Sequence, residues 1–145
     1  MPAIGAILER LPSGTQAIAC VEVAHPEDLQ GWQVSPGVDV RWSFREPGSH
    51  ERGSLLVPAV LEATNELCRS PPQPIIDDVV DPDVDTAILW DVPVDSQPLG
   101  DAYAWLAGEA GVIKKLRRIL VTGAGLHRSS VAFMGYWREG NAEAD

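Results

Sequence analysis

The sequence predicts an α/β fold, in which helices cover a doubly wound, mostly parallel sheet. Gln16 to Val23 is a nearly continuous apolar run of strand length, as expected for a strand that is buried on both faces. In the last third of the chain, an apolar run, an amphipathic helical pattern and a second apolar run follow one another, which is the order of a parallel strand–helix–strand unit. The length of 145 residues predicts that residues 1–145 form one domain.

The first third of the chain predicts a helix and two strands. Pro2 to Leu11 fits a short helix, with proline in its first turn and a Pro-Ser-Gly stretch after its end. Gln16 to Val23 is the buried strand. After a loop-like stretch at residues 25–36, Val38 to Phe44 places apolar side chains at every second position, which predicts a strand with one wetter face near a sheet edge.

The middle of the chain predicts a helix and then an insertion. Ser54 precedes a helical pattern from Leu55 to Leu67 that tolerates Pro58 near its start. Ser70 to Leu99 is rich in Asp and Pro, and we expect an exposed insertion in which Ala87 to Trp90 docks on the body of the protein.

The last third predicts a strand at Ala102 to Ala107, a helix at Glu109 to Val121 and a strand at Val131 to Tyr136. Gly123 to Gly125 reads Gly-Ala-Gly, but it follows a helix rather than a strand. We therefore interpret it as the loop that ends the helix and not as a phosphate-binding fingerprint.

Charge and composition exclude several classes of partner. A net charge of −10 argues against nucleic acid or an anionic membrane as the main partner, and no apolar run is long enough to span a membrane. Neither the two cysteines nor the three histidines have the spacing of a metal site, so we expect reduced thiols and no metal. Without a secretory pattern at the start, a cytoplasmic location is the default expectation.

Five sequence blocks resemble one known family. They are PAIGAILERLPSGT, AIACVEVAHPED, VDVRWSFREPG, YAWLAGEAGVIKKLRRIL and VAFMGYWREG. In this order they are similar to the C-terminal, NAD(P)H-binding half of siderophore-interacting proteins, which are flavin-dependent ferric-siderophore reductases of the ferredoxin-reductase superfamily. The resemblance covers nearly the whole chain apart from the Asp/Pro-rich insertion.

The resemblance implies a ferredoxin-reductase-like nucleotide-binding domain. Such a domain helps to pass a hydride from NAD(P)H to FAD, from which single electrons reduce Fe(III) held by a siderophore. Gly108, Glu109 and Ala110 match the loop that approaches the nicotinamide. Glycine permits close backbone approach, and the following helix N-terminus offers amide donors. The open alternative is that Glu109 only caps its own helix.

A siderophore-facing edge is implied at the end of the last strand. Trp137 and Arg138 match the family's GYWR block, where an aromatic ring can stack on a planar ligand and a cation attracts an anionic iron complex. The basic residues Lys114, Lys115 and Arg118 are candidates for the same task. The alternative is a solvated basic helix face beside a buried Trp and an Arg that only reaches toward solvent.

Adenosine recognition is usually built where the second and third strands end. The resemblance therefore assigns Glu22 to the ribose hydroxyls and Arg45 to a 2'-phosphate.

The sequence also departs from the family. The N-terminal FAD-binding barrel of full-length relatives has no counterpart, nor does the usual first strand of the nucleotide domain, which lies centrally in the order 3-2-1-4-5. We expect that the strands at residues 16–23 and 102–107 pair directly, or that residues 87–90 or a partner's strand fills the gap.

The function expected from the resemblance is the NAD(P)H-binding half of a ferric-siderophore reductase. It would act with a separate FAD-binding barrel protein or with a lost N-terminal domain, and it would be inactive alone. Two alternatives stay open: a non-enzymatic module that binds a siderophore or another anion, and an inactive remnant. A homo-oligomer is also compatible with the sequence.

Overall fold

The computed structural model describes residues 2–45, 48, 51–68, 90–91 and 102–138. These residues fall into two compact units, residues 1–63 and 64–145, which are considered one at a time. Helices and parallel strand pairs make up both units, so the predicted α/β class is confirmed. The prediction of one domain stays a prediction.

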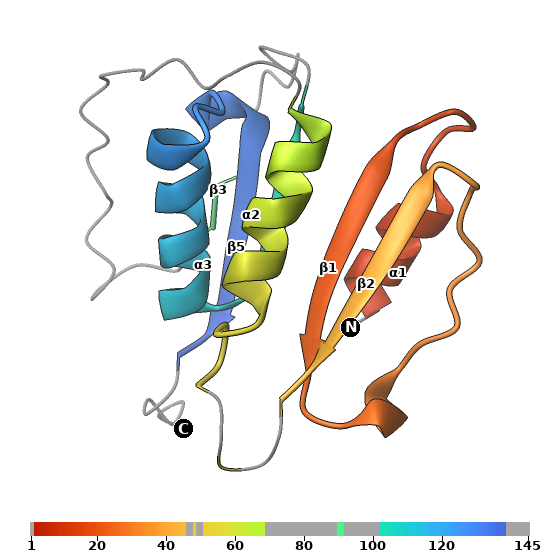
Figure 1. Ribbon diagram of the computed structural model, residues 1–145, viewed down its shortest axis with the longest axis horizontal. Coiled ribbons are helices and arrows are strands. Elements are labelled where there is room, and N and C mark those ends of the chain that lie inside the picture. The colour runs from red at the N-terminus through yellow and green to blue at the C-terminus, as the bar shows by residue number, and fades with distance from the viewer. Residues whose placement is uncertain (1, 46–47, 49–50, 69–89, 92–101, 139–145) are drawn as a thin grey trace. The chain divides into compact units, whose positions relative to one another are not determined.

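The first unit is a parallel strand pair covered by a helix. The helix α1 spans Pro2–Glu9, β1 spans Ala17–Val23 and β2 spans Val38–Phe44 (Figure 1). Ala17 lies opposite Val38 and Val23 opposite Phe44, so the two strands run in register along their whole length. The predicted strand at residues 38–44 has the bounds that the structure shows, and the other two elements differ from prediction by one or two residues at an end.

The core of this unit joins α1 to the strand pair. Leu8 packs with Ala19 and Val38, and partly buried apolar side chains surround them. Among these is Trp32, which comes from the connection between the strands and lies 5.0 Å from Trp42, measured between ring centroids. The connection also contains a short 3-10 helix at Pro26–Asp28, where we expected only a loop.

The helix α2, Leu56–Leu67, follows β2 and crosses the boundary between the two units. It begins one residue later than predicted and includes Pro58 in its first turn, where a missing N–H costs no helical hydrogen bond.

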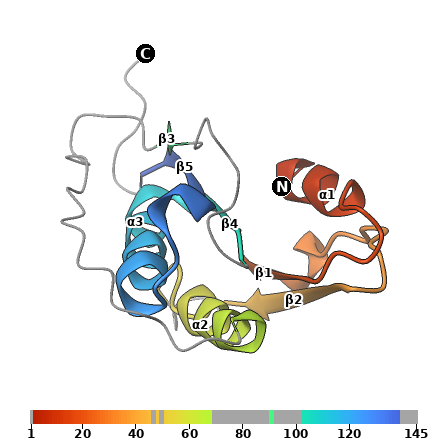
Figure 2. The same cartoon turned by 90° about the horizontal axis from the view of Figure 1, so that it is seen from above.

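The second unit is a three-stranded sheet with a helix on one face. The strand β4 spans Ala104–Glu109, α3 spans Ala110–Arg118 and β5 spans Val131–Trp137 (Figure 2). The strands β4 and β5 are parallel, and β3, Trp90–Asp91, pairs antiparallel with the other edge of β5. After Arg118 the chain continues as one π-helical turn, Ile119–Gly123, so the Gly-Ala-Gly stretch does end a helix as predicted.

Only part of the predicted insertion is described. Trp90 pairs with Met134, which agrees with docking of this segment on the body, whereas residues 69–89 and 92–101 lie outside the described residues.

One of the three expected fillings of the central gap is wrong for the described residues. The direct pairing of β1, in the first unit, with β4, in the second, stays a prediction. Trp90 and Asp91 pair with β5 rather than with β1 or β4, so this stretch does not fill the gap. Residues 2–9 form a helix and thus supply no first strand. A strand from a partner stays a prediction.

Among the helices of the described ranges, none is both long and apolar enough to cross a membrane.

Gly5 gives a test of the packing in the first unit. A Cβ atom at Gly5 would lie 2.5 Å from Trp32 Nε1, which is too close for any real contact. Replacing glycine by alanine inside a helix normally stabilises by about 1 kcal/mol, but overpacking typically costs about 1–3 kcal/mol. We expect Gly5→Ala to lower the free energy of unfolding in urea. Gly31→Ala, beside Trp32 and with open space at its Cβ, is the matched control and should be nearly neutral. Stabilisation by Gly5→Ala would contradict this packing.

Candidate functional site

The carboxyl ends of β4 and β5 lie side by side because the two strands are parallel. Gly108 is opposite Gly135, and the next pair is Glu109 with Trp137, so Tyr136 is an extra residue in β5. This register shift places the predicted nicotinamide loop, residues 108–110, next to the predicted siderophore edge. The structure therefore brings these two groups of residues together.

The first turn of α3 begins at this edge, with Glu109 as its N-cap. The Glu109 carboxylate accepts a hydrogen bond of 2.9 Å from the backbone N–H of Val112. A Cβ atom at Gly111 would lie 3.0 Å from Glu109 Oε2, so the carboxylate folds closely over the turn. Glu109 thus caps its own helix, as the alternative interpretation proposed. The carboxylate also makes this end of α3 unfavourable for a second anion such as a phosphate.

Packing of β4 against α3 does not require glycine at position 108. An added Cβ atom would make ordinary contact, 3.7 Å, with Ile113 Cδ1. Gly108 has a φ of +158°, which L side chains rarely adopt, so its backbone conformation rather than its packing favours glycine.

Two contacts identify which face of the β4–β5 sheet α3 covers. Arg117 on α3 lies with its Cζ atom 4.7 Å from the centre of the Phe133 ring. A Cβ atom added to Gly108 would point toward Ile113 on the same helix. Phe133 and Gly108 therefore face α3, whereas Met134, the next residue along β5, faces the opposite side.

The basic residues of α3 do not gather at the carboxyl edge. Arg118 is exposed and lies eight residues after Ala110, a rise of about 12 Å along the helix. Lys115 is exposed and belongs to the last turn, and Lys114 is half-buried near the middle. The structure does not bring these cations together with Trp137. The buried cation in this helix is Arg117, which sequence reasoning did not single out.

Trp137 and Arg138 lie at the end of β5, and their role toward a siderophore stays a prediction. Trp137 ends β5 opposite Glu109 and is 43% exposed, and Arg138 follows it as a half-buried residue. They lie at the edge where α3 begins, so a cation and an indole flank the residue that caps α3.

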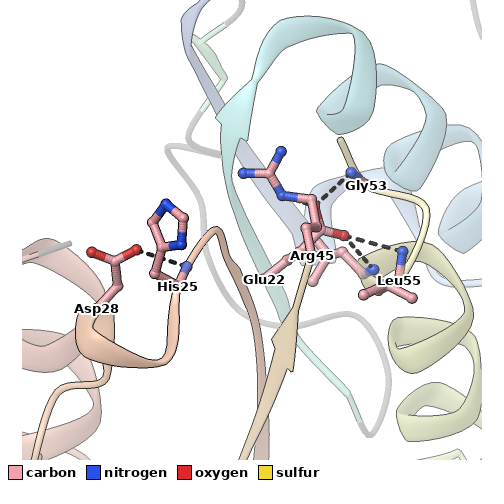
Figure 3. Close-up of polar contacts among 7 residues, drawn as sticks. Glu22, His25, Asp28, Arg45, Gly53 and Leu55 are labelled. Carbon is pink, nitrogen blue, oxygen red and sulfur yellow. Dashed lines mark hydrogen bonds and ion pairs between the residues drawn. The ribbon is translucent and has the colours of Figure 1, made fainter. Parts of the chain in front are cut away.

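The predicted adenosine residues, Glu22 and Arg45, lie in the first unit and contact each other. Arg45 Nε lies 3.1 Å from Glu22 Oε1, and the Glu22 side chain is only 6% exposed (Figure 3). Glu22 is the penultimate residue of β1 and Arg45 directly follows β2, so parallel pairing brings them to one edge. Their roles toward ribose and 2'-phosphate stay predictions.

Glu22 also holds the start of α2. Its carboxylate accepts hydrogen bonds from the backbone N–H groups of Gly53 at 2.9 Å, Leu55 at 3.1 Å and Leu56 at 2.9 Å. These amides would otherwise be the unsatisfied donors of a helix N-terminus. Sequence reasoning missed this contact because Ser54 is a common capping residue, and nothing local indicates a cap 31 residues away.

Within the described ranges, no three residues of the His, Cys, Asp and Glu types lie close enough to hold a metal ion. His127 instead accepts a hydrogen bond from the backbone N–H of Ser129 and contacts the Ser129 hydroxyl, which caps the 3-10 helix at Arg128–Ser130. His50 lies outside the described residues.

Comparison with known families decides the identity of this fold. The family model described as siderophore-interacting protein matches residues 1–140. The chain belongs to the siderophore-interacting protein family. The resemblance of the five sequence blocks is thereby confirmed.

Solved structures of this family share the fold. A siderophore utilization protein from T. fusca matches with a TM-score of 0.62 and 23% identity, over 99% of this chain and 43% of that one. The siderophore-interacting protein SipS from Aeromonas hydrophila matches with a TM-score of 0.60 and 23% identity, over 98% and 43%. The siderophore-interacting protein from Acinetobacter baumannii matches with a TM-score of 0.62 and 17% identity, over 98% and 43%.

At these identities the structures establish a common fold only. The present family member spans less than half of the length of these three chains. A search among curated protein sequences finds no significant match.

Glu22 gives a test of the first unit of this family member. Glu22→Ala leaves three amides and a guanidinium without their acceptor, so we expect the free energy of unfolding to fall by about 3 kcal/mol. Glu22→Gln keeps one acceptor oxygen and should cost less. Glu9→Ala is the control, because Glu9 accepts one exposed hydrogen bond from Gln33 N–H at 3.3 Å. Equal losses for Glu22→Ala and Glu9→Ala in urea unfolding would show that the Glu22 contacts contribute little.

Proposed function

We propose that this chain is the NAD(P)H-binding half of a flavin-dependent ferric-siderophore reductase. The observation that carries the proposal is the family match over residues 1–140. A flavin-binding barrel, in a partner protein or in another part of a longer protein, would complete the enzyme. When bound, NAD(P)H supplies a hydride to the flavin, which passes single electrons to the Fe(III) of the siderophore substrate.

The residues at the end of β4 fit a nicotinamide better than a phosphate. Glu109 places a carboxylate over the first turn of α3, and Gly108, the residue before it in β4, has no side chain. A neutral carboxamide can approach this backbone without repulsion, whereas a phosphate would meet the carboxylate. The nicotinamide ring becomes cationic when it gives up its hydride, and a nearby carboxylate favours that form. We therefore assign Gly108, Glu109 and Ala110 to the nicotinamide end of the cofactor.

Arg138 is the residue that we assign to the substrate. It follows Trp137 at the same edge and gives an acidic protein a local positive charge, which attracts an anionic ferric siderophore. The basic residues of α3, Lys114, Lys115 and Arg118, would contribute only long-range attraction, because the helix carries them away from this edge.

A non-enzymatic module that binds the siderophore without nucleotide is the second candidate. The capping role of Glu109 favours it, because part of the α3 N-terminus is already used by the protein itself. This module would need Trp137 and Arg138 but not residues 108–110.

Equilibrium titration distinguishes the two candidates. We expect the chain to bind NADH or NADPH, and Glu109→Gln to weaken binding of the oxidised, cationic form roughly threefold to tenfold more than binding of the reduced form. Glutamine can still accept the Val112 hydrogen bond, so this variant tests the charge apart from the cap. Glu62→Gln, which removes an exposed carboxylate from α2, is the matched control and should leave both affinities unchanged.

Each outcome of the titration has a consequence. Binding of a ferric siderophore without any nucleotide binding would favour the non-enzymatic module. Absence of both would contradict both candidates.

A further inference from the structure

Positive charge is concentrated in one part of this acidic chain. Residues 102–138 contain six basic residues and one acidic residue, Glu109, which gives this segment a charge of +5. Since the whole chain has a net charge of −10, the other residues together carry −15. A local field of this kind attracts a partner that the rest of the protein repels.

The helix α3 is apolar on its buried side and basic on its outer side. Ile113 and Leu116 are 1% exposed, whereas Lys115 and Arg118 are exposed and Lys114 is half-buried. Arg118 follows the two lysines by three and four residues, the spacing at which side chains are neighbours on a helix. These three cations therefore lie together on one face of α3.

Arg128 lies near the end of this helix. Because α3 begins at the carboxyl end of β4 and runs back along the two parallel strands, its last turn lies at the end of the unit where β5 begins (Figure 1). Arg128 is exposed in the 3-10 helix immediately before β5. We call the four outer cations the basic surface: Lys114, Lys115, Arg118 and Arg128. This surface extends toward the end of β5 opposite Trp137, away from the residues assigned to the cofactor and the siderophore.

No described carboxylate neutralises the basic surface. Within the described ranges, none of its four cations forms an ion pair, whereas in the first unit Arg41 lies 2.8 Å from Asp39. The dipole of α3 favours cations in its last turn, but Lys114 precedes that turn and Arg128 follows the helix. Like charges at neighbouring helix positions destabilise a helix, so carboxylates from another molecule would relieve this repulsion.

We propose that the basic surface docks an acidic segment of a partner protein, with ion pairs between its four cations and the partner's Asp and Glu side chains. Duplex DNA or an anionic membrane is an extended polyanion that would also meet the acidic remainder of the chain and be repelled. A short acidic segment contacts the basic surface without this repulsion. The charge distribution therefore favours a protein partner.

Binding of a fluorescein-labelled deca-aspartate peptide to the full chain tests the basic surface. Fluorescence anisotropy should detect binding at about 50 mM salt and much weaker binding at about 300 mM, because salt screens exposed charges. We expect Arg118→Glu and Arg128→Glu each to weaken binding roughly threefold to tenfold, since each change replaces an attraction by a repulsion.

Arg10→Glu is the matched control. Arg10 is an exposed arginine that directly follows α1 in the first unit, and its reversal changes the net charge by the same amount. This variant should bind the peptide within about twofold of the wild type, since it leaves the local field of the basic surface in place. All three arginines are exposed, so urea unfolding should show that the variants are folded.

The inference is overturned if the peptide does not bind, or if Arg10→Glu weakens binding as much as Arg118→Glu. Tighter binding of a DNA duplex of about 30 base pairs than of the peptide would overturn the choice of a protein partner. The nucleotide titration is a separate measurement, because residues 108–110 lie outside the basic surface.

Discussion

A glutamate at the end of a parallel strand, held by the amides of a following helix, organises each of the two units. Glu22 is the penultimate residue of β1 and caps α2, and Glu109 ends β4 and caps α3. The two contacts differ in reach, because Glu109 acts on its own turn whereas Glu22 acts on amides more than thirty residues away. Parallel pairing creates the need for both, since it gathers strand ends and helix starts at one edge.

Regular patterns made most of the fold predictable. The alternation of apolar and polar residues from Val38 to Phe44 predicted a strand with correct bounds, because successive side chains of a strand lie on opposite faces of the sheet. The strand β4 lies two residues later than predicted. Its start was misplaced because Ala102 and Tyr103 continue the apolar run of the strand toward the N-terminus, and its end was misplaced because the strand continues through Gly108 to the N-cap residue Glu109. The π-helical turn after α3 was not predictable, because Leu120 and Val121 continue the apolar pattern of the helix.

The candidate site was predictable where it depends on strand order and not where it depends on long-range contacts. Parallel pairing of the two predicted strands brings the end of β4 beside the end of β5, so the sequence sufficed for the neighbourhood of residues 108–110 and 137. Arg118 lies away from this edge because α3 runs away from it. The pattern of charges in the sequence does not show in which direction the helix runs. The pairing of Glu109 with Trp137 depends on one extra residue in β5, Tyr136, and no composition rule signals a bulge there.

The two strands of the first unit have unlike outer edges. In β2, Asp39 and Arg41 form an ion pair of 2.8 Å, and charged side chains of this kind discourage further strands from adding to a sheet. In β1 no charge occurs before Glu22, and no proline or lysine interrupts the strand. Such a strand is suited to the interior of a sheet, so when it is left at a border it becomes a template for other extended chains. Of the two strands of the first unit, β1 is therefore the one better suited to pair with a further extended chain, and the charged pair on β2 makes β2 the less suitable.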